Sequence, residues 1–155
     1  MIKKMILMVF YVMILSCKTD SAKYESYFTE HRAGFDNMVS YIQREIIVQN
    51  YKRHKAILVF VAKRTKSPRG NFLYDDDLAK LMIQNEVKEV SCEYNELGSC
   101  GLFSQMIFQM RNENSSGRKA TYFIYNKCDE NDSYERKYLY QKKLRTNWVL
   151  FIDET

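Results

Sequence analysis

The chain has 155 residues, of which 46% are hydrophobic and 28% are charged, which fits one globular domain and excludes an intrinsically disordered chain. The net charge is +5, but Lys3 and Lys4 belong to a predicted export segment, and the remaining 22 Lys and Arg exceed the 19 Asp and Glu by only three. This ordinary surface balance gives no indication of an acidic partner, and export would keep the chain away from nucleic acid.

Residues 1–16 have the pattern of a signal peptide. Lys3 and Lys4 give a positive start, and Met5 to Leu15 follow as eleven residues without a charged side chain. This run is shorter than the roughly 20 residues that a membrane-spanning helix needs. A buried N-terminal helix is the alternative, but the run is apolar on every side and would leave no face for solvent.

The end of this segment, Ile14-Leu15-Ser16-Cys17, resembles the lipobox of bacterial lipoproteins: two aliphatic residues, a small residue and a cysteine. The resemblance covers only the signal peptide and Cys17. It implies that Cys17 is the first mature residue and carries fatty acyl chains, palmitate among them. More than one chain is needed, because a single acyl chain binds membranes only marginally.

The resemblance predicts a membrane-anchored protein of the cell envelope, with residues 17–22 as the lipidated cysteine and its short tether. Inner-membrane lipoproteins of enteric bacteria often carry Asp directly after the cysteine. Lys18 occupies that position here. In a Gram-negative organism this favours the outer membrane.

Residues 23–155 are predicted to form a single α+β domain that begins with a long helix over residues 24–52. Its apolar residues recur at helical spacing on one face: Phe28, Phe35, Met38, Val39, Ile42 and Ile46. Gly34 is a weak point in this pattern, at which the helix could divide.

A buried strand is predicted over residues 56–62, where an apolar run is rich in strand-forming residues. The basic loop that follows, Lys63 to Asn71, would either touch anionic lipid headgroups or be solvated. Asp75, Asp76 and Asp77 then mark the start of a short second helix. They fit helix capping better than a calcium loop, because the alternating ligands of such a loop are missing.

The remaining sequence alternates with a period of two residues and contains short polar turns. Strands are predicted over Val90–Tyr94, Phe103–Arg111, Ala120–Tyr125, from Tyr138 and Tyr140 onward, and over Trp148–Ile152. Short connections of this kind predict an antiparallel meander of four to six strands, with both helices packed on one face.

The sequence predicts no cofactor and no metal site. His31 and His54 have no cysteine or second histidine at the spacing of metal ligands, and no nucleotide-binding or nucleophile motif is present. Catalysis is therefore not the favoured reading of this chain.

Three cysteines follow Cys17, namely Cys92, Cys100 and Cys128. In an oxidising envelope, Cys92 and Cys100 could close a small loop through a disulfide across a predicted turn. The alternative is that all three are free, small buried residues.

A candidate binding face lies late in the chain, where tyrosines are dense. Tyr138 and Tyr140 have polar neighbours and are predicted to face solvent, whereas Trp148 lies in an aliphatic strand and is predicted to be a core residue. Cross-strand packing of these aromatic residues is the alternative.

Together these features predict a small envelope lipoprotein that acts as a non-enzymatic binding or structural module. Its aromatic sheet face would meet an envelope protein or a glycan. The alternatives are a small envelope hydrolase with a dispersed site and a protective, immunity-type inhibitor. The sequence does not indicate an oligomeric state.

Overall fold

The computed structural model describes residues 2–46, 57–64, 72–94, 103–111, 119–127 and 140–154, and within the first range it describes the side chains of 21–44. The helices are α1 (Ile2–Tyr41), which continues into the π-helical turn η1 (Ile42–Ile46), and α3 (Asp76–Gln84). The strands are β1 (Leu58–Val61), β2 (Phe72–Leu73), β3 (Val87–Tyr94), β4 (Phe103–Met110), β5 (Lys119–Asn126), β6 (Tyr140–Arg145) and β7 (Trp148–Glu154).

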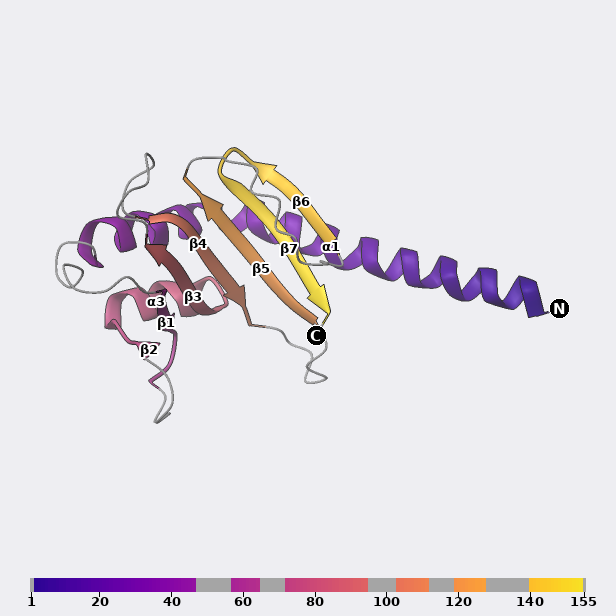
Figure 1. Ribbon diagram of the computed structural model, residues 1–155, viewed down its shortest axis with the longest axis horizontal. Coiled ribbons are helices and arrows are strands. Elements are labelled where there is room, and N and C mark those ends of the chain that lie inside the picture. Colours follow the sequence, from indigo (N-terminus) through magenta and orange to yellow (C-terminus); the bar gives the residue numbers. More distant parts are fainter. Residues whose placement is uncertain are drawn as a thin grey trace.

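The strands form one seven-stranded sheet in the order β2-β1-β3-β4-β5-β7-β6. All neighbours are antiparallel except β1 and β2, which are parallel. Figure 1 shows this open, twisted sheet with α1 running behind it. The α+β class is thus confirmed.

The predicted meander of four to six strands is wrong in strand number and in order. The prediction missed β2, because two residues are too few to show a period. It also missed that β7 lies between β5 and β6. Residues 127–139 separate β5 from β6, so these two strands need not be neighbours. A tight turn at Asn147, whose φ is 69°, pairs β7 with β6 along the edge of β6 that faces β5.

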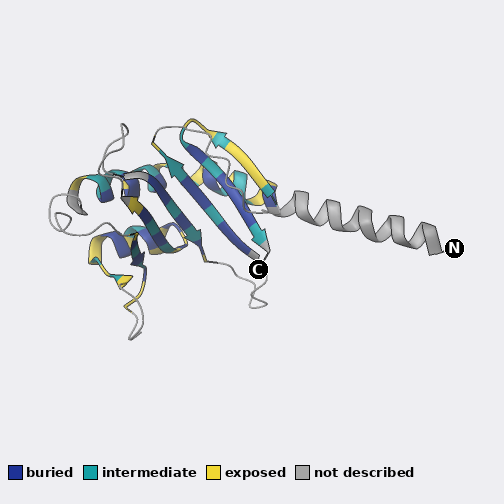
Figure 2. Ribbon diagram, in the orientation of Figure 1, coloured by how far each residue is buried: buried dark blue, intermediate teal, exposed yellow. Residues whose placement is uncertain are grey.

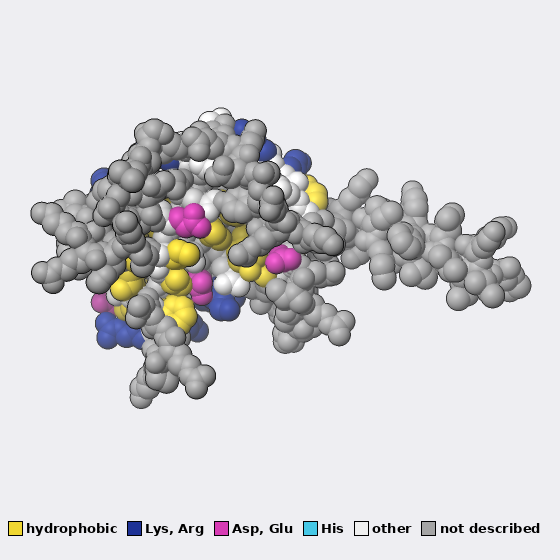
Figure 3. Space-filling view, viewed as in Figure 1, with side chains coloured by type: hydrophobic (Ala, Val, Ile, Leu, Met, Phe, Trp, Pro, Cys, Tyr) yellow, Lys and Arg dark blue, Asp and Glu magenta, His cyan; other side chains and the backbone are white. Residues whose placement is uncertain are grey.

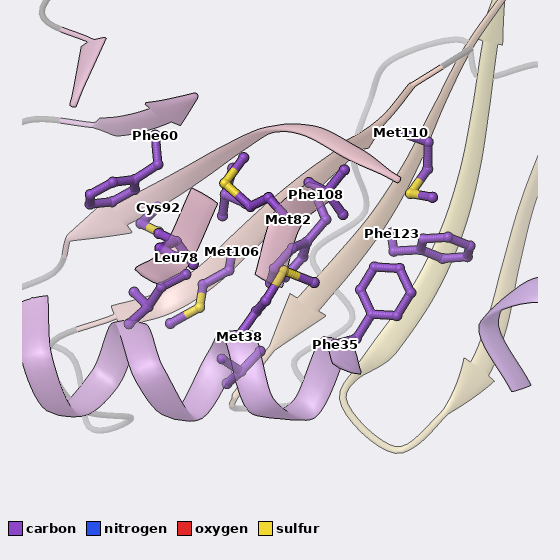
Figure 4. Close-up of a cluster of buried hydrophobic side chains, with 14 of the residues drawn as sticks. Phe35, Met38, Phe60, Leu78, Met82, Cys92, Met106, Phe108, Met110 and Phe123 are labelled. Atoms are coloured by element: carbon purple, nitrogen blue, oxygen red, sulfur yellow. The ribbon is translucent and has the colours of Figure 1, made fainter. Parts of the chain in front are cut away.

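The apolar stripe of α1 lies on the sheet as its spacing predicts. Phe28, Phe35, Met38, Val39 and Ile42 are all buried. The ring of Phe35 meets Phe108 and Phe123 edge-on, with centroids 5.8 and 5.0 Å away. Figure 4 shows Phe35 and Met38 pointing from α1 toward the side chains of the strands. The core of the domain therefore lies between this helix and the sheet.

Gly34 does not divide α1, which continues through it to Tyr41. A Cβ at this position would overlap the side-chain amide of Asn85, the residue that ends α3. Glycine therefore permits a close approach of α1 and α3, which explains a residue that otherwise weakens a helix.

The start of α3 is capped as predicted. The Asp75 carboxylate accepts hydrogen bonds from the backbone N–H groups of Asp77 and Leu78, at 3.1 and 2.8 Å. The same Oδ1 atom accepts a hydrogen bond from the Tyr41 hydroxyl at 2.9 Å. The cap of α3 is thereby tied to the end of α1.

The helix-covered face of the sheet carries Trp148, Leu150 and Ile152, all of which are buried. The prediction that Trp148 is a core residue is confirmed. Figure 2 shows buried residues alternating with half-buried ones along the central strands, as a two-residue period requires.

Candidate functional site

Several predicted site residues lie outside the described part of the chain. Cys17 precedes the first described side chain, and Cys100 and Tyr138 lie in ranges that the structure does not describe. Lipidation at Cys17, the disulfide to Cys100 and a binding role for Tyr138 therefore stay predictions.

Tyr140 was predicted to lie on the sheet face away from the buried strand residues, and this prediction is wrong. It is paired with Ile152 across β6 and β7, so both side chains share the helix-covered face. Tyr140 is half-buried, and its hydroxyl donates a hydrogen bond to Glu25 Oε1 at 2.9 Å. Burial, followed by this hydrogen bond, raises the pKa of Tyr140. The tyrosine thus joins an edge strand to α1.

The opposite side of the sheet is a second candidate surface, which we call the uncovered face. Its aliphatic side chains form a row in register across the strands, from Val59 through Ile107 and Ile124 to Val149, with Ser91 between the first two. Its other members include Val61, Glu89, Glu93, Gln105, Gln109, Ala120, Tyr122, Lys143, Phe151 and Asp153. Figure 3 shows hydrophobic side chains beside acidic ones from this side.

Exposure varies along the uncovered face. Ile124 and Phe151 are only 4% and 1% exposed, whereas Val59, Ile107 and Val149 are half-buried. None of the described helices packs on this face, because α1 and α3 contribute to the core on the other side. Its accessible part is therefore formed by the half-buried members of the row and their acidic neighbours.

A groove between α1 and β6 is the third candidate, and we call it the α1–β6 groove. It has a volume of about 270 Å³. Its lining consists of Glu25, Phe28, Thr29, Arg32, Lys142, Lys143, Leu144 and Arg145. Four cationic residues thus border one carboxylate, but the pairing of Lys143 with Val149 places the Lys143 side chain on the uncovered face.

Two residues of β6 bind the Glu25 carboxylate of the groove. Lys142 Nζ lies 2.6 Å from Glu25 Oε2, while the Tyr140 hydroxyl bonds the other oxygen. The hydrogen bond from Lys142 is the main cause of a lowered pKa of Glu25, and the same bond raises the pKa of Lys142. Both groups are therefore charged at neutral pH.

Asp36, which is not part of the groove lining, pairs with Arg32 of that lining. Its Oδ2 atom lies 3.3 Å from Arg32 Nε, and its Oδ1 atom accepts a hydrogen bond from the Trp148 indole at 3.2 Å. The Arg32 Nε atom is buried and has no hydrogen-bond partner among the described residues. The attraction between Arg32 and Asp36 is thus ionic, and the Arg32 side chain is 42% exposed.

Sequence reasoning missed the α1–β6 groove. Glu25 and Lys142 are 117 positions apart, and no local pattern indicates such a pair. The only available signal was the density of cations in β6, which the sequence analysis treated as the polar surroundings of an exposed tyrosine patch.

His31 is engaged with its own helix. Its ring stacks on Tyr27 with centroids 4.0 Å apart, and its Nδ1 atom lies 3.1 Å from the Tyr27 carbonyl oxygen. Burial, with a smaller effect of Glu86, raises the pKa of Tyr27 to about 12. His54 lies outside the described ranges. Within those ranges, no three His, Cys, Asp or Glu side chains come together as metal ligands.

Cys92 lies on the helix-covered face of β3, is fully buried and makes no disulfide with a described residue. Its burial strongly raises the pKa of the thiol, so the reactive thiolate is scarce at neutral pH. This agrees with a small packing residue.

Among the residues that the structure describes, no helix is both long and apolar enough to span a membrane. Comparisons with protein-family models, with curated proteins and with solved structures find no match for this chain.

Proposed function

We propose that this chain is an exported, lipid-anchored protein of the cell envelope, whose domain binds a partner protein through the uncovered face. The support for the anchor is the segment Ile14-Leu15-Ser16-Cys17 after a charged and then apolar start.

The observation that carries the binding role is the aliphatic row of the uncovered face. Val59, Ile107 and Val149 are half-buried and in register across the sheet, and no described helix packs on them. Acidic residues stand beside this row: Glu89, Glu93 and Asp153. The matching partner is a protein surface with an apolar centre and a basic rim, because interfaces pair apolar cores and opposite charges.

The anchor is tested by feeding cells a labelled fatty acid. The wild-type chain should incorporate the label and migrate as a processed form, whereas Cys17→Ser should do neither. Cys100→Ser serves as the matched control and should be labelled like the wild type. An intact wild-type chain without label would remove the anchor from this proposal.

The binding role is tested by a photo-crosslinking amino acid placed at position 107 in living cells. The control carries the same group at position 83, because Ile83 is a hydrophobic residue of α3 that is 47% exposed. We expect one defined adduct from position 107 and none of that mass from position 83. The adduct should disappear in a Val59→Lys background and persist with Ile83→Lys. Equal adducts from both positions would contradict a specific face.

An inhibitor of a lytic enzyme or of a toxin would use the same surface. The identity of the crosslinked protein distinguishes this role from that of an assembly partner. Purified partner and domain would then show whether an enzymatic activity of the partner falls on binding.

A further inference from the structure

We propose that the α1–β6 groove binds a phosphate group, such as the headgroup phosphate of an anionic phospholipid. On the helix-covered side the groove has three cationic side chains, Arg32 from α1 and Lys142 and Arg145 from β6. They outnumber the two carboxylates that pair with them, Glu25 and Asp36, and the excess positive charge attracts an anion. An anion held between them would join the helix to the edge of the sheet.

The kinds of cation favour phosphate over a carboxylate. Arg32 and Arg145 carry planar guanidinium groups, whose fork of donors matches phosphate oxygens, and Lys142 adds an ammonium group. Arg145 is exposed and makes no ion pair with a described residue. A dianion can satisfy several of these donors together, whereas a carboxylate has only two oxygens.

The lining of the groove favours an organic phosphate ester over inorganic phosphate. Phe28, which is buried, and the half-buried Leu144 give the groove an apolar floor beside its cations. The volume of about 270 Å³ exceeds what a bare anion needs. A glycerol phosphate head with its first carbon atoms would fill both parts.

The place of the groove in the chain agrees with a lipid source, a step that rests on the proposed anchor at Cys17. Glu25 comes eight residues after Cys17. Even a fully extended segment of that length spans at most about 28 Å, and a helical one about 12 Å. The anchor would therefore hold the groove close to the membrane surface, where anionic headgroups attract Lys and Arg.

The test is amine footprinting of the full chain by mass spectrometry. The probes are inorganic phosphate, glycerol phosphate, and nanodiscs of phosphatidylcholine with or without phosphatidylglycerol, with acetate at equal ionic strength as the anion control. We expect a several-fold slower modification of Lys142 with glycerol phosphate and in the phosphatidylglycerol discs. Lys80, an exposed lysine of α3, should change little.

Two charge reversals keep the result independent of folding. The variant Arg145→Glu should abolish protection of Lys142 while retaining the wild-type melting temperature. Lys88→Glu, an exposed change on β3, should keep the protection.

Each outcome is decisive. Protection by soluble phosphates but not by the discs assigns the site to a free phosphate compound. Equal protection by acetate, equal protection of Lys80, or no protection overturns the proposal. Because this readout does not require acylation of Cys17, failure of the anchor and failure of the groove are separately visible.

Discussion

The Trp148 indole donates a hydrogen bond to Asp36 across 3.2 Å, which joins β7 to α1. The ring itself is buried among aromatic residues, with Phe28 at 5.1 Å and Phe108 at 5.5 Å between centroids. A buried tryptophan usually needs a partner for its single N–H group, and the half-exposed Asp36 provides one at the edge of the core. This residue should therefore carry a large share of the stability.

Trp148→Ala should lower the free energy of unfolding by about 3–5 kcal/mol, through lost burial and a cavity. Trp148→Phe should lower it by less than half as much, because most of the apolar contact stays and water can reach Asp36. Urea denaturation followed by circular dichroism measures both changes. A loss of under about 1 kcal/mol in the alanine variant would contradict the core position of this ring.

Gly34→Ala should destabilise the domain, although alanine is the better helix former. The new methyl group would overlap Asn85, and overpacking of this kind costs about 1–3 kcal/mol, which exceeds the propensity gain of about 1 kcal/mol. Adding Asn85→Ala should recover part of the loss.

The control for this prediction is Ala33→Gly at the exposed neighbouring position. It should cost about 1 kcal/mol by propensity alone, and Asn85→Ala should not relieve that cost. Thermal melting of the variants and their combinations gives the coupling. A more stable Gly34→Ala variant would mean that α1 and α3 do not approach as described.

Glu25→Gln should reduce stability at neutral pH by less than about 1 kcal/mol, as for most exposed ion pairs. The pKa of Glu25 is lowered in the folded state, chiefly by the hydrogen bond from Lys142, so its contribution is complete above the unfolded value near 4.5. It is lost as the pH falls through the lower folded value. The difference between wild type and variant should therefore shrink below about pH 4.5.

Urea midpoints of wild type and Glu25→Gln between pH 3 and pH 8 test this sign. Thr29→Ala, on the same exposed face of α1, should shift the midpoint equally at all pH values, because its hydroxyl bonds only a backbone carbonyl. A difference that grows toward low pH would exclude the described pair of Glu25 and Lys142.

Cys92 should react with a thiol reagent only when the domain unfolds. The thiol is fully buried and its pKa is raised by burial, so both access and thiolate are lacking. Mass mapping after labelling in buffer and in urea should show modification more than about 100-fold slower in buffer. Cys92 that stays unlabelled in urea without reductant would instead support the predicted disulfide to Cys100.

The elements with local periodicity could be predicted from the sequence. The spacing of the apolar residues from Phe28 to Ile42 predicts the buried stripe of α1, and Asp75 predicts the N-terminal cap of α3. The face of Tyr140 could not be predicted, because it depends on the register between β6 and β7, which shifts between Lys143 and Arg145. Alternation within one strand identifies two faces but not which of them a neighbouring strand shares.

The α1–β6 groove was equally out of reach of sequence reasoning. Its two sides lie more than a hundred positions apart, and only the fold brings them together. The sequence predicted that one side of the sheet would be open, but it did not predict which residues form that side. The tyrosines proposed for it came from an edge strand, whereas the observed row is aliphatic and crosses the central strands.

The insertion of β7 between β5 and β6 governs when the domain can be completed. β6 has β7 as its only strand neighbour in the described sheet, so a chain that emerges from its N-terminus cannot add β6 before β7 has followed. Part of the stripe of α1 also stays incomplete, since Phe28 packs on Trp148, which lies 120 positions later, whereas Phe35 can already meet Phe108 and Phe123. The domain therefore completes its core and its sheet edge only when its last strand has been made.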